Sequence, residues 1–231
     1  MITFLVPTFN EKQNIFIFID TINNLKLNFD YDILFVDDNS DDGTYDELVR
    51  AKNFYRNVNF FIRKEKKRDL TQSIVFAISK LKSKYTFILD CDLQHDYKKI
   101  QLCVDEVENK KMDLVIGSRF VQDGQNIIMS KKRIIESKLA ILITKLLGID
   151  KIKDPMSGFF VIKTNLLSKI KNKITTRGFK ILLTIIFLNK KTLSYKEIPI
   201  KFNERKFGKS KLNFRVRLLF IEQILRLVFK V

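Results

Sequence analysis

The sequence predicts an α/β fold whose sheet is mostly parallel, and two observations support this prediction. Short apolar runs that end in polar residues alternate along the chain with stretches in which apolar residues recur at helical spacing. This alternation, at the spacing of βαβ units, is typical of a doubly wound sheet with helices on both faces. In addition, the run at 86–89 has the length and composition of a strand buried in a parallel sheet, and Asp90-Cys91-Asp92 ends it abruptly.

The expected elements follow one another in regular order. Strands are predicted at residues 2–6, 31–36, 58–62, 86–89 and 112–118. Helices are predicted at 15–25, 97–108, 131–148, 178–189 and 212–231, and a further helix follows the third strand and ends at Leu81. Asn10, after the first strand, is a candidate N-cap for the first helix. No GxGxxG or GxxxxGK[ST] motif occurs, so neither a dinucleotide fold of that type nor a P-loop is indicated.

The composition indicates a globular protein of a reducing compartment. At 231 residues and 45% hydrophobic residues, the chain is long enough for one sizeable core or for one domain plus an appendage. Its two cysteines, Cys91 and Cys103, have no metal-ligand spacing, so no disulfide framework is expected. Met1 leads directly into a strand-like segment, so we expect no signal peptide. No apolar run approaches the roughly 20 residues of a membrane span.

The charge of the chain is concentrated in its second half. The net charge is +17, yet residues 1–118 hold 17 basic and 19 acidic side chains, whereas residues 119–231 hold 26 and 7. A basic half can bind nucleic acid or an anionic membrane, or simply keep the protein soluble. A nucleic-acid-binding protein is the non-enzymatic alternative. We do not expect nucleic acid as a partner, because no recognition motif occurs and the basic half is interleaved with aliphatic side chains.

The acidic segment at 90–96 is the first candidate site. Two carboxylates, Asp90 and Asp92, stand at the carboxyl end of a predicted strand, where open α/β sheets bind ligands, and Gln94 adds a neutral oxygen. Oxygen ligands of this kind suit Mg²⁺ or Mn²⁺, which bind one or two carboxylates together with substrate phosphates. The alternative is a solvated acidic loop. Asp38 ends the second strand, a position from which aspartates commonly bind ribose hydroxyls.

Several motifs in order resemble a known family. PTFNE (7–11), VDDNSDDGT (36–44), DCDLQH (90–95) and GSRF (117–120) resemble the inverting family 2 glycosyltransferases, which have a GT-A fold. DPMSGFF (154–160), RGFK (177–180) and FNERKFGKSKL (202–212) are similar to the dolichyl-phosphate mannosyltransferase group of polyprenyl-phosphate sugar synthases. The resemblance covers essentially the whole chain. It implies a Rossmann-like nucleotide-sugar transferase fold over 1–211, with a sugar-nucleotide half (1–118) and an acceptor half (119–211).

The resemblance also implies a role for particular residues. The nucleotide pocket would be lined by Pro7, Phe9, Glu11, Val36 and Asp38. The sugar nucleotide would contact Asp90, Cys91 and Asp92, and the metal would be held by Asp92 and Gln94, with Asp90 beside them. The diphosphate would be bound by Arg205 and Lys211, and the phosphate of the lipid acceptor by Arg119, Arg133 and Ser137. His95 is interpreted as structural.

Several features depart from the pattern of the group, among them Thr184, where Glu is expected after RGFK, and the lack of a second glycine beside Gly124. Phe9 replaces the usual Tyr, Asp41 a usual Pro and Cys91 a usual Ala, and residues 65–75 lack the glycines that are common after the third strand. These departures bear on the identity of the donor more than on the chemistry.

The second half supplies few candidates for a general base. Its carboxylates are scattered, with no adjacent pair, whereas inverting transferases that act on a sugar hydroxyl need a carboxylate to remove its proton. A phosphate monoester is already anionic at neutral pH and needs no base. The pattern therefore favours a phosphate nucleophile, with Asp154 as the alternative base.

The C-terminal segment 212–231 is predicted to be an amphipathic helix in a membrane interface. Its wide apolar face comprises Val216, Leu219, Phe220, Ile224, Leu227 and Val228, and basic residues gather on the other side. We therefore expect peripheral attachment to an anionic surface on the cytoplasmic face of a membrane, with a small membrane-anchoring subunit as a possible partner. A terminal helix docked on its own domain is the alternative.

The expected reaction is transfer of a hexose, with inversion, to a polyprenyl (dolichyl-type) phosphate, using Mg²⁺ or Mn²⁺. Mannose from GDP-mannose is the preferred donor. The enzymatic alternative is a related transferase that uses UDP-glucose or an amino-sugar donor, or a sugar hydroxyl acceptor.

Overall fold

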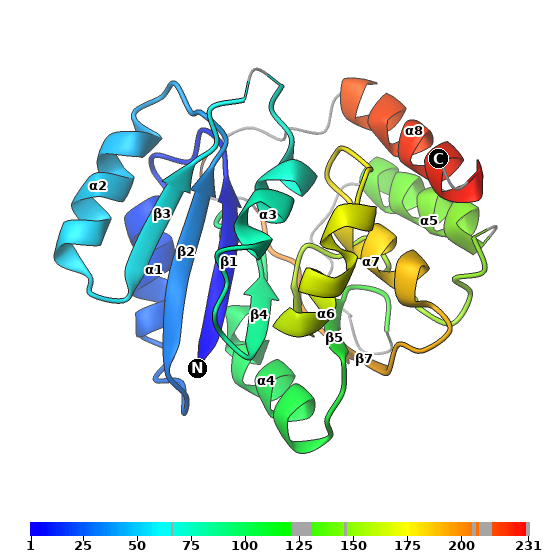
Figure 1. The fold of residues 1–231 in the computed structure, drawn as a ribbon, viewed down its shortest axis with the longest axis horizontal. Coiled ribbons are helices and arrows are strands. Elements are labelled where there is room, and N and C mark those ends of the chain that lie inside the picture. The colour runs from blue at the N-terminus through cyan, green and yellow to red at the C-terminus, as the bar shows by residue number, and fades with distance from the viewer. Residues whose placement is uncertain (66, 122–130, 146, 205–206, 208–213, 230–231) are drawn as a thin grey trace.

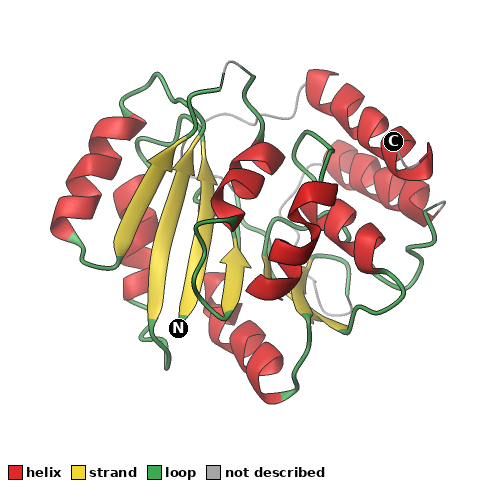
Figure 2. Cartoon of the chain, in the orientation of Figure 1, coloured by secondary structure: helices red, strands yellow, loops and turns green. Residues whose placement is uncertain are grey.

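The computed structural model describes residues 1–231 except 66, 122–130, 146, 205–206, 208–213 and 230–231. Within this part of the chain, strands and helices alternate (Figures 1 and 2), and the helices at Thr44–Phe54 and Thr164–Ile170 are additions to those predicted. The strands are β1 (Ile2–Thr8), β2 (Tyr31–Asp37), β3 (Val58–Ile62), β4 (Tyr85–Ile88), β5 (Leu114–Ser118), β6 (Phe160–Lys163) and β7 (Tyr195–Pro199). The α-helices are α1 (Ile15–Asn23), α2 (Thr44–Phe54), α3 (Leu70–Ile78), α4 (Ile100–Asn109), α5 (Lys131–Lys145), α6 (Thr164–Ile170), α7 (Ile181–Asn189) and α8 (Phe214–Phe229). Short 3-10 helices lie at Tyr97–Lys99 and Lys171–Lys173.

The seven described strands form one mostly parallel sheet in the order β3-β2-β1-β4-β6-β5-β7. Only β6 runs antiparallel to its neighbours, β4 and β5, within this sheet. The strand order reverses between β1 and β4, which pair in parallel. In open α/β sheets such a switch point leaves a crevice outside the carboxyl ends of the strands, where ligands bind. The acidic turn that follows β4 therefore lies at the preferred site of the fold.

Helices cover both faces of the sheet, as the alternation of elements predicts. Along β1, Phe4 and Val6 belong to the core under α1, α2 and α4, whereas Leu5 points into the other core, which α3, α6, α7 and α8 cover. This alternation follows from the two-residue period of a strand. Because both faces are buried, every residue of β1 lies inside the protein. The near-continuous apolar runs of β1, β2 and β4 have this physical cause.

The helix at α7 is apolar all round because it is a core helix. Residues 181–186 are all buried, so its hydrophobicity reflects packing and not contact with a membrane. Among the described residues, no helix is both long and apolar enough to cross a membrane.

The terminal helix α8 packs on the domain with most of the face that was predicted to contact a membrane, except Val228, which is 47% exposed. Ile224 and Leu227 are buried in the core that also contains α7, and Phe220 packs against it. Gln223, also buried, donates through Nε2 to the carbonyl oxygen of Lys180 (2.8 Å) and to Oγ1 of Thr184 (2.9 Å). The docked-helix alternative is therefore correct for this face.

A second, outward face of α8 is also apolar. Leu218, Ile221, Leu225, Val228 and Phe229 recur at intervals of three and four residues and are 47–69% exposed. The helix thus buries one apolar face against the domain and presents another to solvent. Figure 1 shows α5, α7 and α8 gathered at one end of the molecule, opposite α2.

Candidate active site

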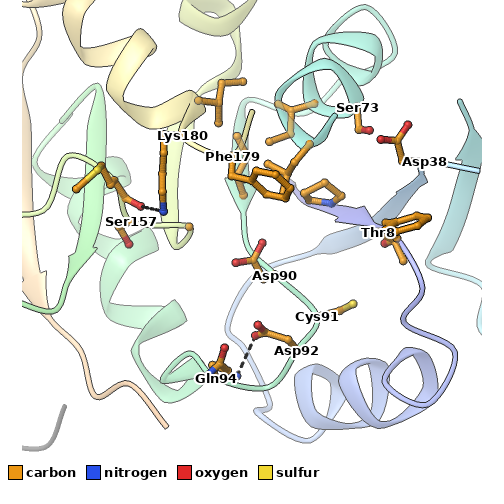
Figure 3. A pocket seen from close by; sticks show the side chains of 18 of the residues that line it. Thr8, Asp38, Ser73, Asp90, Cys91, Asp92, Gln94, Ser157, Phe179 and Lys180 are labelled. Atoms are coloured by element: carbon orange, nitrogen blue, oxygen red, sulfur yellow. Dashed lines mark hydrogen bonds between the residues drawn. The ribbon is translucent and has the colours of Figure 1, made fainter. Parts of the chain in front are cut away.

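A cavity of about 470 Å³ lies at the carboxyl ends of β1 and β4. Its polar side is formed by the loops after β1, β2 and β4, and Figure 3 shows Asp90 and Asp92 directed into it opposite Asp38 and Thr8. Its other side is apolar, and the side chains there come from α3, the segment around Met156, the start of α7 and the inner face of α8. These apolar lining residues include Leu70, Ile74, Met156, Phe179, Ile181, Val216 and Leu219. The cavity therefore joins an acidic end to an apolar wall.

The acidic turn after β4 is held by hydrogen bonds to its backbone. The hydroxyl of Tyr97 donates to the carbonyl oxygen of Asp90 (2.7 Å), and Gln94 N–H donates to Oδ1 of Asp92 (3.2 Å). Burial, followed by the charge of Asp92, raises the pKa of Tyr97, so this hydroxyl keeps its proton. Leu93 has a φ of 62°, a left-handed conformation that costs energy for a branched side chain and that lets the chain reverse within the turn.

The glycine of the SGFF motif makes room for Asp90. A Cβ atom at Gly158 would lie 2.7 Å from Oδ2 of Asp90 and 3.5 Å from Nε2 of His95. His95 Nε2 in turn lies 3.4 Å from the same carboxylate oxygen, and its ring packs on Phe159 and Phe202. His95 therefore supports the position of Asp90, as expected for a structural residue.

The donor set of this turn fits a hard divalent cation. Asp90 and Asp92 offer carboxylate oxygens, and Gln94 is oriented by donating its Nε2 hydrogen to the carbonyl oxygen of Asn203 (3.0 Å), which assigns the amide oxygen to the opposite side. In the part of the chain that the structure describes, no group of three or more His, Cys, Asp or Glu side chains is placed to hold a metal. Mg²⁺ and Mn²⁺ do not require one, because they take one or two protein carboxylates and complete their shell with water and substrate phosphate.

Arg119 lies at the end of β5 and is locked to Asp154. Its Nε and Nη2 atoms each lie 2.8 Å from a different oxygen of this carboxylate, and its backbone N–H also donates to Asp154 (3.0 Å). Asp154 is completely buried. Burial acts to lower the pKa of Arg119, but the charge of Asp154 and its hydrogen bonds together raise that pKa. Asp154 is thus an orienting partner for a cavity cation and is not placed to act as a general base.

Asp38 and Asp69 form a buried network at the nucleotide side of the cavity. Oδ1 of Asp38 lies 2.6 Å from Nη2 of Arg63, and its Oδ2 accepts the backbone N–H of Asp69. The Asp69 side chain caps α3 by accepting from the backbone N–H of Gln72 (3.0 Å), and it also accepts from the backbone N–H of Gly178 (2.7 Å). Burial raises the pKa of both carboxyls, in opposition to these hydrogen bonds. The network ties the loop before α3 to the loop before α7.

The structure brings most of the predicted site residues together. The residues that line the cavity include Pro7, Phe9, Glu11, Asp38, Asp90, Cys91, Asp92, Gln94 and Arg119. Val36 is fully buried in the core and does not line the cavity, and Ser137, on α5, is not among the lining residues. The side chain of Arg133, and residues Arg205 and Lys211, lie outside the described part of the chain.

The sequence did not single out several residues of this cavity. Arg68 and Asp69 come from the glycine-free segment after β3, and Phe179 and Lys180 come from the RGFK motif, to which no role had been given. Figure 3 shows Phe179 and Lys180 across the cavity from the acidic turn. Nothing in the spacing of these residues indicates that they meet, because they join the cavity through long-range packing.

The role predicted for Asn10 as a helix cap is wrong. The helix α1 begins at Ile15, four residues beyond the place where Asn10 would cap it, and Asn14 stands at its N-cap. Asn10 has a φ of 51° and is used to join two loops: its backbone N–H donates to Oγ of Ser40 (2.8 Å) and its Nδ2 to Asp41 (2.8 Å).

Comparisons with known proteins agree with this fold. A family model for glycosyl transferase family 2 matches residues 3–171. Dolichol-phosphate mannosyltransferases of Pyrococcus furiosus and Saccharomyces cerevisiae are 29% and 27% identical to the chain over 98% of its length. The chain covers 63% of the length of the first of these relatives and 86% of the second.

Two solved structures show the same fold at low identity. Glucosyl-3-phosphoglycerate synthase of Mycobacterium tuberculosis, in complex with Mn²⁺, UDP and glucosyl-3-phosphoglycerate, superposes with a TM-score of 0.72 at 13% identity, over 100% of this chain and 79% of that one. A mannosyltransferase of Pyrobaculum calidifontis, in complex with GDP-mannose and Mn²⁺, gives a TM-score of 0.64 at 15% identity, over 99% and 63%.

The sheet order, the acidic turn at the switch point and these structural matches define the protein as one with the GT-A fold of nucleotide-sugar transferases. The family match covers well over half of the chain. The chain belongs to glycosyltransferase family 2.

Proposed function

We propose that this protein transfers mannose from GDP-mannose to the phosphate of a polyprenyl lipid of the dolichyl type, with inversion and with a bound divalent cation. The observation that carries the proposal is the composition of the cavity, in which the acidic turn at Asp90–Asp92 faces an apolar wall that includes Phe179, Val216 and Leu219. A sugar nucleotide suits the first side, and the first units of an isoprenoid chain suit the second. The names of the Pyrococcus and Saccharomyces relatives support the same reaction.

Different residues of the chain would bind the metal ion, the acceptor phosphate and the donor diphosphate. Asp92 and Gln94 would hold Mg²⁺ or Mn²⁺, which neutralises charge on a leaving diphosphate. Arg119, oriented by its two bonds to Asp154, lines the cavity and would bind the anionic acceptor where it enters from the apolar side. Arg133 and Ser137 are proposed as further ligands of the acceptor phosphate, and Arg205 and Lys211 as ligands of the donor diphosphate.

The burial and hydrogen bonding of Asp154 support a phosphate nucleophile over a sugar hydroxyl. This carboxylate is buried and accepts three hydrogen bonds from Arg119, so it is not available to remove a proton. An acceptor that is already anionic at neutral pH does not need it. Transfer from UDP-glucose or an amino-sugar nucleotide to a hydroxyl remains the rival function.

We also propose that α8 holds the protein on the cytoplasmic face of an anionic membrane. The outer stripe, defined as Leu218, Ile221, Leu225, Val228 and Phe229, is a contiguous apolar surface on a helix whose inner face lines the cavity. The half of the chain that contains it carries 26 basic and 7 acidic residues, which favours a negatively charged surface. A bilayer satisfies both features and also contains the acceptor. A small membrane-anchoring subunit is the other proposed occupant of this stripe.

A donor panel tests the reaction. The protein is incubated with radiolabelled GDP- and UDP-sugars, Mn²⁺ and a short polyprenyl phosphate, and transfer to the organic phase is counted. We expect transfer from GDP-mannose, and its loss by at least about 100-fold in D92A or in excess EDTA, since both remove the cation that stabilises the leaving group. D92A should still unfold cooperatively. Transfer only to a soluble sugar acceptor, or undiminished transfer in EDTA, would contradict the proposal.

A further inference from the structure

The guanidinium of Arg68 covers the aromatic ring that the family resemblance assigns to the nucleotide base. Its Cζ atom lies 4.2 Å from the centroid of the Phe9 ring, and both residues line the cavity. Arg68 belongs to the glycine-free segment after β3, and Phe9 stands where the group usually has Tyr. The contact therefore lies at positions where the chain departs from the family pattern.

Arg68 connects the loops that follow the first three strands. Its Nη2 atom donates to Oδ2 of Asp41 (2.9 Å) and to the carbonyl oxygen of Asn39 (3.4 Å), both in the loop after β2. Asp41 also accepts from Nδ2 of Asn10, in the loop after β1. The hydrogen bond from Asn10 and that from Arg68 lower the pKa of Asp41, so this carboxylate stays ionised. Asp41 is another position at which the chain departs from the group.

The backbone on both sides of Arg68 is anchored. Before it, the carbonyl oxygen of Lys67 accepts from Nη2 of the buried Arg63 (2.7 Å). After it, the N–H group of Asp69 donates to Asp38, and the Asp69 carboxylate binds the N–H groups of Gln72 and Gly178. Arg68 is thus a half-exposed side chain on a fixed backbone, held against Phe9 by Asp41.

The distance between ring and guanidinium decides what a base can contact. Two planar groups in van der Waals contact are about 3.5 Å apart, so a base placed between Phe9 and Arg68 needs a separation of about 7 Å. The observed 4.2 Å leaves no room for it. The base would therefore contact the guanidinium of Arg68 and not the ring of Phe9. The Phe9 ring supports the guanidinium from the other side.

We propose that Arg68, seated on Phe9 and braced by Asp41, contacts the base of the sugar nucleotide and makes the site prefer guanine to uracil. The proposal rests on the proposed donor. Among the described residues, the hydrogen-bond partners of the guanidinium all use Nη2, which leaves Nε and Nη1 as the donors for the base. Guanine presents two adjacent acceptors, O6 and N7, which match the donors of arginine, whereas uracil presents the single acceptor O4 on the corresponding edge.

Titration of GDP and of UDP, each with Mn²⁺, into the full-length protein tests this role. We expect R68A to weaken GDP binding about tenfold while UDP binding changes less than twofold, since tenfold lies within the range by which a bidentate guanidinium pair discriminates bases. R68K keeps the charge but not the planar array of donors, so it should lose the preference as well. The matched control is R50A, because Arg50 also lies over a phenylalanine, Phe16 (5.4 Å), and pairs with a carboxylate, but does so far from the cavity.

A double-mutant cycle separates the platform from direct stacking. If Phe9 acts through Arg68, F9A should weaken GDP binding in the wild type but add less than a twofold loss in R68A. An equal cost of F9A in both backgrounds would mean that the ring itself stacks on the base, and this would overturn the proposal. Equal losses of GDP and UDP in R68A, or no loss, would overturn it too. A wild type that binds neither nucleotide, or prefers UDP, would instead refute the proposed donor.

Discussion

Asp90 and Asp92 leave the same strand, but their side chains have different surroundings. The side chain of Asp90 is 38% exposed and lies against His95 and the space left by Gly158. Asp92 is buried and accepts a hydrogen bond from the backbone of Gln94. This difference suggests separate tasks, with Asp92 binding the cation and Asp90 meeting the sugar. Because Asp90 occupies the space beside Gly158, its position depends on a residue that is more than 60 positions away in the sequence.

Gly158→Ala should reduce transfer without unfolding the protein. The added Cβ atom would lie 2.7 Å from Oδ2 of Asp90, a distance that forces the carboxylate to move. We expect kcat/KM to fall by about tenfold or more, since a displacement of about 1 Å at a reacting group can cost 100-fold. The measurement is steady-state kinetics of G158A, D90A and the double variant. If G158A acts through Asp90, it adds little loss in the D90A background, and a full additional loss would exclude this route.

Asp69 provides a prediction for the pH dependence of stability. Burial raises the pKa of this carboxyl, so the folded protein holds the proton more tightly than the unfolded chain does. The contribution of Asp69 to the free energy of unfolding is therefore full below the ordinary aspartate pKa and is lost as the pH rises through the raised value. D69N cannot titrate. Thermal unfolding at several pH values between about 4 and 7 should show the wild type losing stability relative to D69N as the pH rises. A trend in the opposite direction would mean that the hydrogen bonds of Asp69 outweigh its burial.

At the scale of the elements, the strands that the sequence predicted are those with a clear local pattern of apolar residues. The strand β3 has the predicted bounds, and β1, β2 and β4 differ from prediction by one or two residues at their ends. The last three are short apolar runs that are largely buried, and such runs stand out in the sequence. The strand β6 was not predicted. It has only four residues, and it is a strand because β4 and β5 pair with it from either side. The prediction also lacked β7, whose residues are mostly half-buried.

The same division applies to the site. The acidic turn, the loop at Pro7–Glu11 and Arg119 are marked in the sequence by residues that end strands, and the structure places all of them at one cavity. The pairing of Arg119 with Asp154, by contrast, joins residues 35 positions apart, and that of Asp69 with Gly178 joins residues 109 apart. Such contacts leave no periodic signal, because tertiary packing alone brings the partners together.

Substitutions on the outer stripe of α8 should affect membrane binding and leave folding unchanged. Replacing Leu218 and Leu225 of the outer stripe by Glu should abolish flotation with phosphatidylglycerol vesicles, since it removes apolar contact and adds repulsion. The melting temperature should stay nearly unchanged because both side chains are exposed. The control is F54E, at an exposed phenylalanine of α2 on the opposite end of the molecule, which should float normally. If the double variant still floats, the outer stripe is not the membrane contact.

The inner face of α8 leads to the opposite expectation. Ile224 is buried, and replacing it by Ala should destabilise the protein by about 2 kcal/mol or more, because the change leaves a cavity in the core. Chemical denaturation of I224A gives this value directly. For the same reason, removal of residues 213–231 should lower stability and not merely detach the protein from vesicles. A truncated form as stable as the full chain would mean that α8 is not part of the core.

At the scale of the whole molecule, the boundary in charge is not a boundary in structure. The acidic first half ends with β5, yet β6, from the basic half, lies between β4 and β5 in the sheet. The loop at Thr176–Gly178 also bonds to the start of α3: Gln72 donates to the carbonyl oxygen of Thr176 (3.0 Å), and Thr71 to that of Gly178 (2.9 Å). The two halves of the chain therefore share one sheet and are joined by hydrogen bonds.

A fragment of residues 1–118 should not fold on its own. Without β6, the strand β5 has lost its link to β4, and without α6 and α7 the core under β1 and β4 is exposed. We expect the fragment to lack a cooperative thermal transition by circular dichroism, whereas the full chain melts in one step. A fragment that melts cooperatively and binds GDP with Mn²⁺ would show that the nucleotide half is an independent domain.

The strand β6 lies between two strands that both precede it in the chain, β4 and β5. This order has a consequence for the protein while it is being synthesised. The nascent chain contains β4 and β5 before β6 exists, and the 42 positions between Ser118 and Phe160 take roughly 2 to 8 s to translate. The same interval separates the emergence of β5 from the ribosome from that of β6, and during it the open edge of β4 and the unpaired β5 both lack their partner strand. Strand edges of this kind pair readily with other chains. On a polysome, where several copies are at the same stage, the β5 of one nascent chain can therefore occupy the place that β6 of its neighbour has yet to fill.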